Sequence, residues 1–322
     1  MPQDYTYAVA RIRSKELSLF SQKELDELLN QPDYDSCIRY LSEKGWGSDS
    51  EKQTADELLK QEENKLWHLM KELVPDETVF DFFRVSKDFH NLKVAVKAAT
   101  RGAKTDGMYM QNGTVEPSVI ASAVENRDKN RLPDFLRDIA QQSITTLLQS
   151  SDGQLCDIMI DKASLDYVYS LTQKSDNEII RLYGELFVAA SDIKIAVRCC
   201  KTNKSAEFAK KAMAECDTLN INSLATACAK GFDAVCDYLL KTSYKGAVEP
   251  LKKSPSAFEK WCDDLLTDKM KGQKREPFSI GPLVAYIIAR QNEIKAVRLI
   301  LSCKLNSLDE AVIKERLRDM YV

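Results

Sequence analysis

The chain has 322 residues, of which 44% are hydrophobic and 30% are charged, and it carries a formal net charge of −3. This composition is typical of a soluble globular protein and far from that of a disordered chain. No basic run exceeds a pair such as Lys210-Lys211 or Lys252-Lys253. The sequence therefore argues against nucleic acid as a partner.

The N-terminal part of the chain predicts a series of helices. Residues 5–13 alternate weakly between polar and apolar side chains but could equally begin a helix. Ser21 and Glu24 match a capping box, in which each side chain satisfies a backbone N–H at the start of a helix. Leucines follow this box at helical spacing. Further helices are predicted over residues 36–44, 54–73, 78–85 and 88–100.

Residues 101–117 combine several glycines with polar side chains and are the best candidate for a linker. Helical periodicity continues beyond this segment, and no segment shows a convincing strand pattern. The longer helices in this part are predicted over residues 133–149, 155–173, 177–198, 258–270 and 283–301. The expected fold class is therefore all-α.

One sequence pattern, Asp88 to Lys97, has two weaker copies that begin at Ser191 and Asn292. The lysines of the three copies, Lys93, Lys194 and Lys295, are 101 residues apart, although an alignment on Ala-Val-Arg shifts the third copy by one residue. A fixed period is the mark of a repeated structural unit. We therefore expect three similar helical modules.

The expected modules cover residues 1–115, 116–220 and 221–322. The last module ends in an additional helix, which Ser307 and Glu310 would open as a second capping box. A leftover helix of this kind suggests closure, in which the end of the chain packs near its beginning.

The nine cysteines are odd in number and form no C-x-x-C pair, which favours reduced, core-filling thiols over a disulfide framework or a zinc site. Only His68 and His90 could add imidazole ligands. The sequence also lacks a glycine-rich loop of the kind that cradles phosphates. We expect no metal and no cofactor.

Asp88 and His90 could be interpreted as an acid–base pair. Residues two apart on a helix do not face each other, so a structural role is favoured, with Asp88 in the first turn of its helix. The alternative that stays open is an enzyme with an unfamiliar site around Asp88, His90 and a buried cysteine.

The longest apolar run, residues 283–289, is far shorter than the roughly 20 residues that span a bilayer. Residues 1–10 also lack the apolar core of a signal peptide. We expect a cytoplasmic protein without direct membrane insertion, which meets a membrane only through another protein.

Four blocks together resemble the C subunit of the bacterial and archaeal V/A-type rotary ATPases, a family whose eukaryotic member is the d subunit of the vacuolar ATPase. The blocks cover residues 7–16, 88–93, 293–298 and 315–322. Their order and spacing span the whole chain. The middle copy, Ser191-Asp192-Ile193-Lys194, departs most from the pattern.

This resemblance implies three similar helical domains around a pseudo-threefold axis, in a funnel-shaped protein. It also implies a non-catalytic rotor subunit that sits on the membrane proteolipid ring and receives the central stalk, which the D and F subunits form. Such a protein would transmit torque between ATP hydrolysis or synthesis and ion transport. The alternative is an all-α scaffold or adaptor with other protein partners.

The polar groups of the family-like blocks are the candidates for a partner-facing or inter-module interface. They are Arg11, Arg13, Asp88, Asn91 and Lys93.

Overall fold

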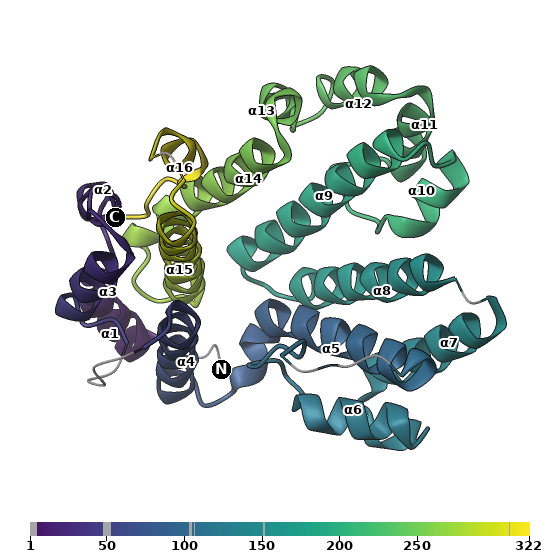
Figure 1. Ribbon diagram of the computed structural model, residues 1–322, viewed down its shortest axis with the longest axis horizontal. Coiled ribbons are helices and arrows are strands. Elements are labelled where there is room, and N and C mark those ends of the chain that lie inside the picture. Colours follow the sequence, from purple (N-terminus) through teal and green to yellow (C-terminus); the bar gives the residue numbers. More distant parts are fainter. Residues whose placement is uncertain (1–4, 48–52, 103–104, 106, 151, 309) are drawn as a thin grey trace. The chain divides into compact units, whose positions relative to one another are not determined.

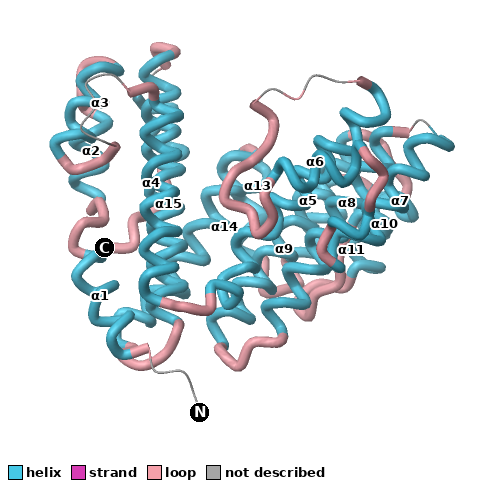
Figure 2. Tube along the Cα trace, turned by 90° about the horizontal axis from the view of Figure 1, so that it is seen from below, coloured by secondary structure: helices cyan, strands magenta, loops and turns pink. Residues whose placement is uncertain are grey.

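The computed structural model describes residues 5–47, 53–102, 105, 107–150, 152–308 and 310–322. These residues form helices and loops, with no strand among them, so the predicted all-α class is confirmed (Figures 1 and 2). Contacts between Cα atoms divide the chain into two compact units. Unit 1 joins residues 1–77 to residues 249–322, and unit 2 covers residues 78–248. The boundaries of the three sequence modules are a separate question and stay a prediction.

Unit 1 brings the two ends of the sequence together. Its elements are α1 (Thr6–Glu16), α2 (Gln22–Leu29), α3 (Tyr34–Glu43), α4 (Ala55–Leu73), α14 (Pro255–Met270), η4 (Lys271–Arg275), α15 (Gly281–Leu305) and α16 (Glu310–Arg316). The central helix is α15, which packs against α1, α2, α3, α4, α14 and α16 and runs beside α4 in both views (Figures 1 and 2). Residues 281–289 of α15 are all buried, so this stretch is apolar on every side.

Helices from the two ends of the chain, α2 and α16, share one hydrophobic core. Leu25 and Leu28 of α2 belong to the same buried cluster as Ile300 of α15 and Ile313 of α16. The end of the chain therefore packs with its beginning inside unit 1.

The two predicted capping boxes have different outcomes. Ser21 and Glu24 form the box at the start of α2, as predicted. Ser307 adopts a positive φ of 52°, unlike the extended backbone of a capping residue, and α16 is described from Glu310 onward. Asp309, which lies between them, is outside the described residues.

Unit 2 is a continuous stretch of chain. Its elements are α5 (Asp81–Arg101), α6 (Pro117–Glu125), η2 (Lys129–Arg131), α7 (Asp134–Ser150), α8 (Gly153–Gln173), α9 (Glu178–Lys201), α10 (Ala206–Ala212), α11 (Ile221–Lys230), α12 (Phe232–Leu239) and η3 (Lys245–Ala247). Helices α5, α8 and α9 lie side by side in that order (Figure 1). Helices α6 and α7 pack on α5, and α10, α11 and α12 pack on α9. The chain passes between the units within η1 (Glu77–Phe80) and α13 (Val248–Lys253).

One predicted boundary is wrong. The helices expected over residues 78–85 and 88–100 form the single helix α5, because Ser86 and Lys87 do not interrupt the apolar face that Val85, Phe89 and Leu92 bury. Asp88 consequently lies about two turns inside α5 and not in its first turn.

No helix in the described part of the chain is both long and apolar enough to span a membrane.

The close contact between α8 and α9 predicts that position 184 must be a glycine. A Cβ atom at this position would lie 2.6 Å from Cβ of Thr172, whose side chain is fully buried, and would also overlap its hydroxyl. We expect Gly184→Ala to lower the free energy of unfolding by about 1–3 kcal/mol, despite the helix preference of alanine. Thermal or urea unfolding measures the change.

The matched control is Gly272→Ala in η4, where an added Cβ meets nothing within 4 Å. A Gly184→Ala variant as stable as this control would show that α8 and α9 do not approach so closely.

Candidate functional site

The three helices that carry the sequence repeat each bury a polar side chain at the same repeat position. Asn91 in α5, Asp192 in α9 and Glu293 in α15 are 101 residues apart, and all three are fully buried. Each one accepts a hydrogen bond from the backbone N–H of a segment that precedes a short helix. The repeat therefore extends from the sequence to the way in which each long helix holds a neighbouring segment.

In the first copy, polar side chains of α5 hold the segment that leads to α6. Asn91 accepts from the Met110 N–H at 2.8 Å and donates to the Met110 carbonyl at 2.9 Å. Asp88 accepts from the N–H groups of Thr114 and Val115 at 2.9 and 3.1 Å. The segment predicted as a linker is thus bound along α5 in its described residues 108–115.

The close approach of this segment to α5 explains why residue 113 is a glycine. A Cβ atom at Gly113 would overlap the Asp88 carboxylate. Arg84, one turn before Asp88, donates to the Gly113 carbonyl at 2.6 Å. Burial nevertheless raises the pKa of Asp88, although the hydrogen bonds from Thr114 and Val115 act in the opposite direction.

In the second copy, two acidic residues of α9 hold the segment that leads to α11. Asp192 accepts from the Ala214 N–H at 3.1 Å. Glu185 accepts from the Thr218 N–H at 2.8 Å and also from the hydroxyl of Tyr169 at 3.0 Å. Burial alone would raise the pKa of Glu185, but the hydrogen bonds, chiefly from Thr218, outweigh burial and lower it.

Asp192 differs from Glu185 in having too few partners. Its second carboxylate oxygen, Oδ2, is buried without a hydrogen-bond partner among the described residues. Burial raises the pKa of Asp192 to about 7. The negative charges of Asp166 and Glu185 also raise this pKa, whereas the positive charge of Lys162 lowers it. Below about pH 7 the protonated Asp192 resembles Asn91, the neutral residue at the same position of the first copy.

In the third copy, α15 holds the segment that leads to α2, from the other end of the chain. Glu293 accepts from the Phe20 N–H at 2.6 Å. Arg290 forms ion pairs with both Glu293 and Glu62 of α4, and its guanidinium lies 4.3 Å from the ring centroid of Trp46. These contacts join α15 to three separate N-terminal segments of unit 1.

The charged side chains of this cluster, Arg290, Glu62 and Glu293, are largely buried. Burial opposes the charge of Arg290, but Glu293 and Glu62 outweigh this effect and raise its pKa. Burial raises the pKa of Glu293 despite the nearby guanidinium. Glu62 is itself buried and accepts from the Gly47 N–H at 2.8 Å and from Lys65 at 2.7 Å.

The remaining predicted interface residues all make contacts within their own unit. Arg13 donates to Glu16 and to the carbonyl oxygens of Gln273 and Glu276, which ties α1 to η4 and to the loop that follows it. Lys93 lies 2.6 Å from Asp161 of α8.

Arg11 is the most accessible of the five predicted residues. Its side chain is 41% exposed and lies 3.7 Å from Glu72. The structure therefore brings Asp88 and Asn91 together along one segment and leaves the other three apart. Their proposed partner or inter-module role stays a prediction.

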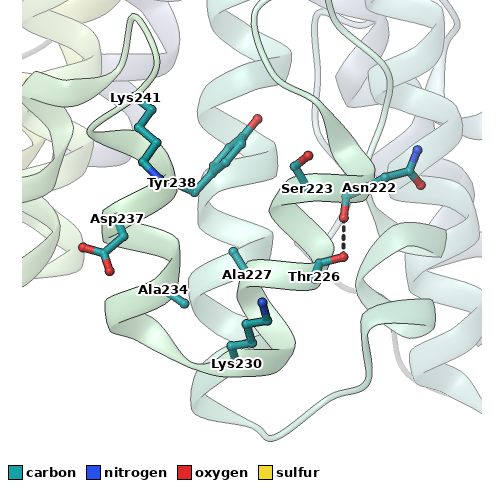
Figure 3. A pocket seen from close by; sticks show the side chains of 9 residues that line it. All are labelled: Asn222, Ser223, Thr226, Ala227, Lys230, Ala234, Asp237, Tyr238 and Lys241. Carbon is teal, nitrogen blue, oxygen red and sulfur yellow. Dashed lines mark hydrogen bonds between the residues drawn. The ribbon is translucent and has the colours of Figure 1, made fainter.

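Surface hollows occur within each of the two units. In unit 1, a hollow of about 350 Å³ is lined by Arg11, Trp46, Tyr286 and Arg290, among others. In unit 2, a groove of about 450 Å³ runs between α11 and α12 (Figure 3).

Small side chains, Ala227 and Ala234, line this groove together with Tyr238, and the charged groups of Lys230, Asp237 and Lys241 are exposed along it (Figure 3). This lining, with its exposed charges and small side chains, is unlike the mostly apolar lining of pockets that bind small molecules.

The acid–base alternative has no geometric support. Asp88 is engaged by Thr114 and Val115, whereas His90 Nε2 lies 3.1 Å from the Met108 carbonyl oxygen. The two side chains thus have separate partners. Within the described ranges, no three His, Cys, Asp or Glu side chains group so as to hold a metal ion.

The anchoring roles of Glu62, Glu185, Asp192, Arg290 and Glu293 were not predicted from the sequence. For two of these residues the signal was present in the repeat register, since positions 91, 192 and 293 are polar within otherwise apolar helix faces. Glu62 has no such signal, because it belongs to the charged series of an amphipathic helix.

The buried ion pairs predict a specific stability pattern. We expect Arg290→Met to lower the free energy of unfolding by about 3–5 kcal/mol, because it leaves Glu293 buried without its counter-charge and leaves Glu62 paired with Lys65 alone. The triple variant with Glu62→Gln and Glu293→Gln keeps the acceptors for Gly47 and Phe20 and should recover most of the loss. Urea unfolding of both variants provides the measurement, and an Arg290→Met cost below about 1 kcal/mol would contradict the arrangement.

Asp192 predicts a pH-dependent stability. Between pH 4 and 7 the Asp192 carboxyl keeps its proton in the folded protein and loses it in the unfolded chain. The free energy of unfolding therefore falls by about 1.4 kcal/mol for each pH unit in this range. Above pH 7 this loss of stability does not increase further. Asp192→Asn should therefore match the wild type near pH 4 and be more stable by a few kcal/mol at pH 7.

Glu185→Gln on the same helix is the control of opposite sign. The lowered pKa of Glu185 contributes stability above pH 4.5 that is lost as the pH falls, so this variant should be less stable at neutral pH. Chemical unfolding at pH 4, 5.5 and 7 compares the three proteins. Parallel pH profiles for all of them would exclude the assigned charge states.

Comparison with known proteins connects this architecture to one family. The sequence profile of the ATP synthase (C/AC39) subunit matches residues 8–316. The chain is 24% identical to the C subunit of the V-type sodium ATPase of Enterococcus hirae, over 96% of this chain and 97% of that protein. It is 23% identical to the C subunit of the A-type ATP synthase of Methanocaldococcus jannaschii, over 97% and 86% of the two chains. It is also 23% identical to the C subunit of the V-type ATP synthase of Thermus thermophilus, over 98% of both chains. The chain belongs to the ATP synthase (C/AC39) subunit family, that is, to the C subunits of the V/A-type rotary ATPases.

Proposed function

We propose that this protein is a non-catalytic rotor subunit in the central stalk of a V/A-type ATPase or ATP synthase. It would form a socket that joins a stalk of the D and F subunits to the membrane proteolipid ring. In this position it would transmit torque between the catalytic part of the complex and ion transport. The observation that carries the proposal is the family match over residues 8–316, with relatives that align over most of their own length.

The three-module organisation and the pseudo-threefold, funnel-shaped arrangement belong to the same proposal. Their support is the common hydrogen bond from a backbone N–H before a short helix to Asn91, Asp192 or Glu293. In the third copy this bond returns to Phe20 near the chain's beginning, as expected for a closed series of modules.

The anchored segments suit a part that transmits torque. A loose loop stores rotation as local bending, whereas a segment fixed by several hydrogen bonds transfers force to the helix that holds it. Buried, fully hydrogen-bonded polar networks stiffen their surroundings. The proposal also includes a cytoplasmic location, peripheral to the membrane through the complex.

The first test is assembly. The purified chain is mixed with a reconstituted D–F stalk and, separately, with proteolipid rings, and the complexes are measured by size-exclusion chromatography with light scattering. We expect a complex with the stalk or with the ring. A monomer that binds neither partner would end the rotor assignment and leave the family membership and fold.

Charge reversal tests the predicted contact residues. We expect Arg11→Glu to weaken stalk or ring binding while the thermal unfolding temperature changes little, since Arg11 is 41% exposed and its ion pair at 3.7 Å is long. Arg13→Glu should weaken folding as well, because Arg13 holds the loop at Gln273 and Glu276.

Lys23→Glu is the matched control, since its side chain is 87% exposed in the same unit and lies 3.9 Å from Glu27. If Arg11→Glu and Arg13→Glu both fold and bind like this control, these arginines are not interface residues.

A further inference from the structure

The hollow in unit 1 lies between one face each of α1, α4 and α15. On α1, Arg11 and Lys15 are four residues apart, so their side chains lie on the same face of the helix. Tyr286 and Arg290 have the same spacing on α15. The hollow has a volume of about 350 Å³, and sites for small molecules span about 300–1,000 Å³. Its size therefore fits a small ligand.

The lining of this hollow is rich in positive charge. Among the described residues that form it, five side chains are cationic and two are carboxylates. The cations are Arg11, Lys15, Lys44, Lys65 and Arg290. The chain as a whole carries a formal net charge of −3. The positive charge is thus a local feature of this hollow, opposite in sign to the net charge of the protein.

Apolar side chains lie between these charges. Trp46, Leu66 and Tyr286 also line the hollow, and each is buried, with 4%, 3% and 6% exposure. Apolar walls lower the local dielectric constant and concentrate the field of nearby charges. An anion in this hollow would therefore be attracted more strongly than on a flat, fully solvated surface.

Three of the cations already have carboxylate partners. Lys44 lies 2.7 Å from Glu24. Lys65 and Arg290 both pair with Glu62. These partners neutralise much of the charge of the three side chains, so a ligand would depend mainly on the other two cations.

Arg11 and Lys15 are the cations that remain available. Lys15 is exposed, and its ammonium group has no partner among the described residues. Arg11 makes a long ion pair of 3.7 Å with Glu72, and its Nε is buried without a hydrogen-bond acceptor in the described part of the chain. A buried donor without an acceptor costs free energy, and two like charges one helical turn apart repel each other. An anion between these side chains would relieve both costs.

We propose that this hollow binds a small oxyanion with two or more negative charges, that is, a polycarboxylate or a polyphosphate of low molecular weight. The guanidinium of Arg11 can donate in a planar fork to two oxygens of such a group, and the flexible Lys15 adds a second positive charge. Two available cations match an anion with two charges, whereas a singly charged anion would leave one of them unpaired. The site lies wholly within unit 1 and does not depend on the proposed rotor role.

Calorimetric titration of the full-length protein tests the proposal. The protein is titrated with citrate and, separately, with pyrophosphate at low ionic strength. We expect saturable one-to-one binding of at least one of these anions, and the tighter of the two identifies carboxylate or phosphate as the preferred group. Added sodium chloride should weaken the binding, because salt screens exposed charges over about 10 Å at 0.1 M. Acetate, with a single charge, should bind more weakly than citrate.

Lys15→Gln is the variant that locates the bound anion. We expect it to weaken binding about two- to fivefold, the effect of removing one exposed charge from an ion pair. Its thermal unfolding temperature should not change, since Lys15 is exposed and has no partner among the described residues.

Lys23→Gln is the matched control. The Lys23 side chain is 87% exposed in the same unit and is not among the residues that line the hollow. This variant should bind the anion as the wild type does.

Three results would overturn the proposal. They are the absence of saturable binding with both citrate and pyrophosphate, an unchanged affinity in Lys15→Gln, and an equal loss of affinity in Lys15→Gln and Lys23→Gln. None of these results bears on binding to a stalk or a proteolipid ring, so the rotor assignment is tested separately.

Discussion

Buried polar side chains on three long helices are the constraint on which the rest of the structure depends. A polar group away from water must find a hydrogen-bond partner or cost free energy. On α5, α9 and α15 the partner is the backbone of a segment that would otherwise be free. The same bond therefore satisfies the side chain and fixes the approach to the short helices α6, α11 and α2.

The three copies differ in how the buried polar side chain avoids an unpaired charge. Asn91 is neutral by its chemistry, and Asp192 is largely protonated in mildly acidic solution, since burial raises its pKa to about 7. Glu293 is paired with Arg290, which in turn binds Glu62 and lies over Trp46. Only the third solution needs residues from distant parts of the chain. It is also the solution that holds the two ends of the sequence in one unit.

Local patterns predicted the helices, the capping box at Ser21 and the all-α class, because helical periodicity and capping depend on neighbouring residues. The resemblance also identified the family. The wrong predictions are the division of α5 and the place of Asp88 in a first turn, because Ser86 and Lys87 do not interrupt the apolar face of this helix. The sequence also did not show that the segment before α6 is bound along α5, because the partners Thr114 and Met110 lie 26 and 19 residues from Asp88 and Asn91. Glu62 and Arg290 are 228 residues apart, so no local pattern joins them.

The bond between Glu293 and the Phe20 N–H has a consequence for synthesis of the chain. These residues are 273 positions apart, and a ribosome releases Phe20 long before it makes Glu293. Unit 2 is a continuous stretch that ends at Val248, so all of its residues are made before α15 is translated. Helices α1 to α4 must instead wait, with their apolar faces uncovered, until α15 emerges. The N-terminal part of this protein is thus the first to be made and the last to be completed.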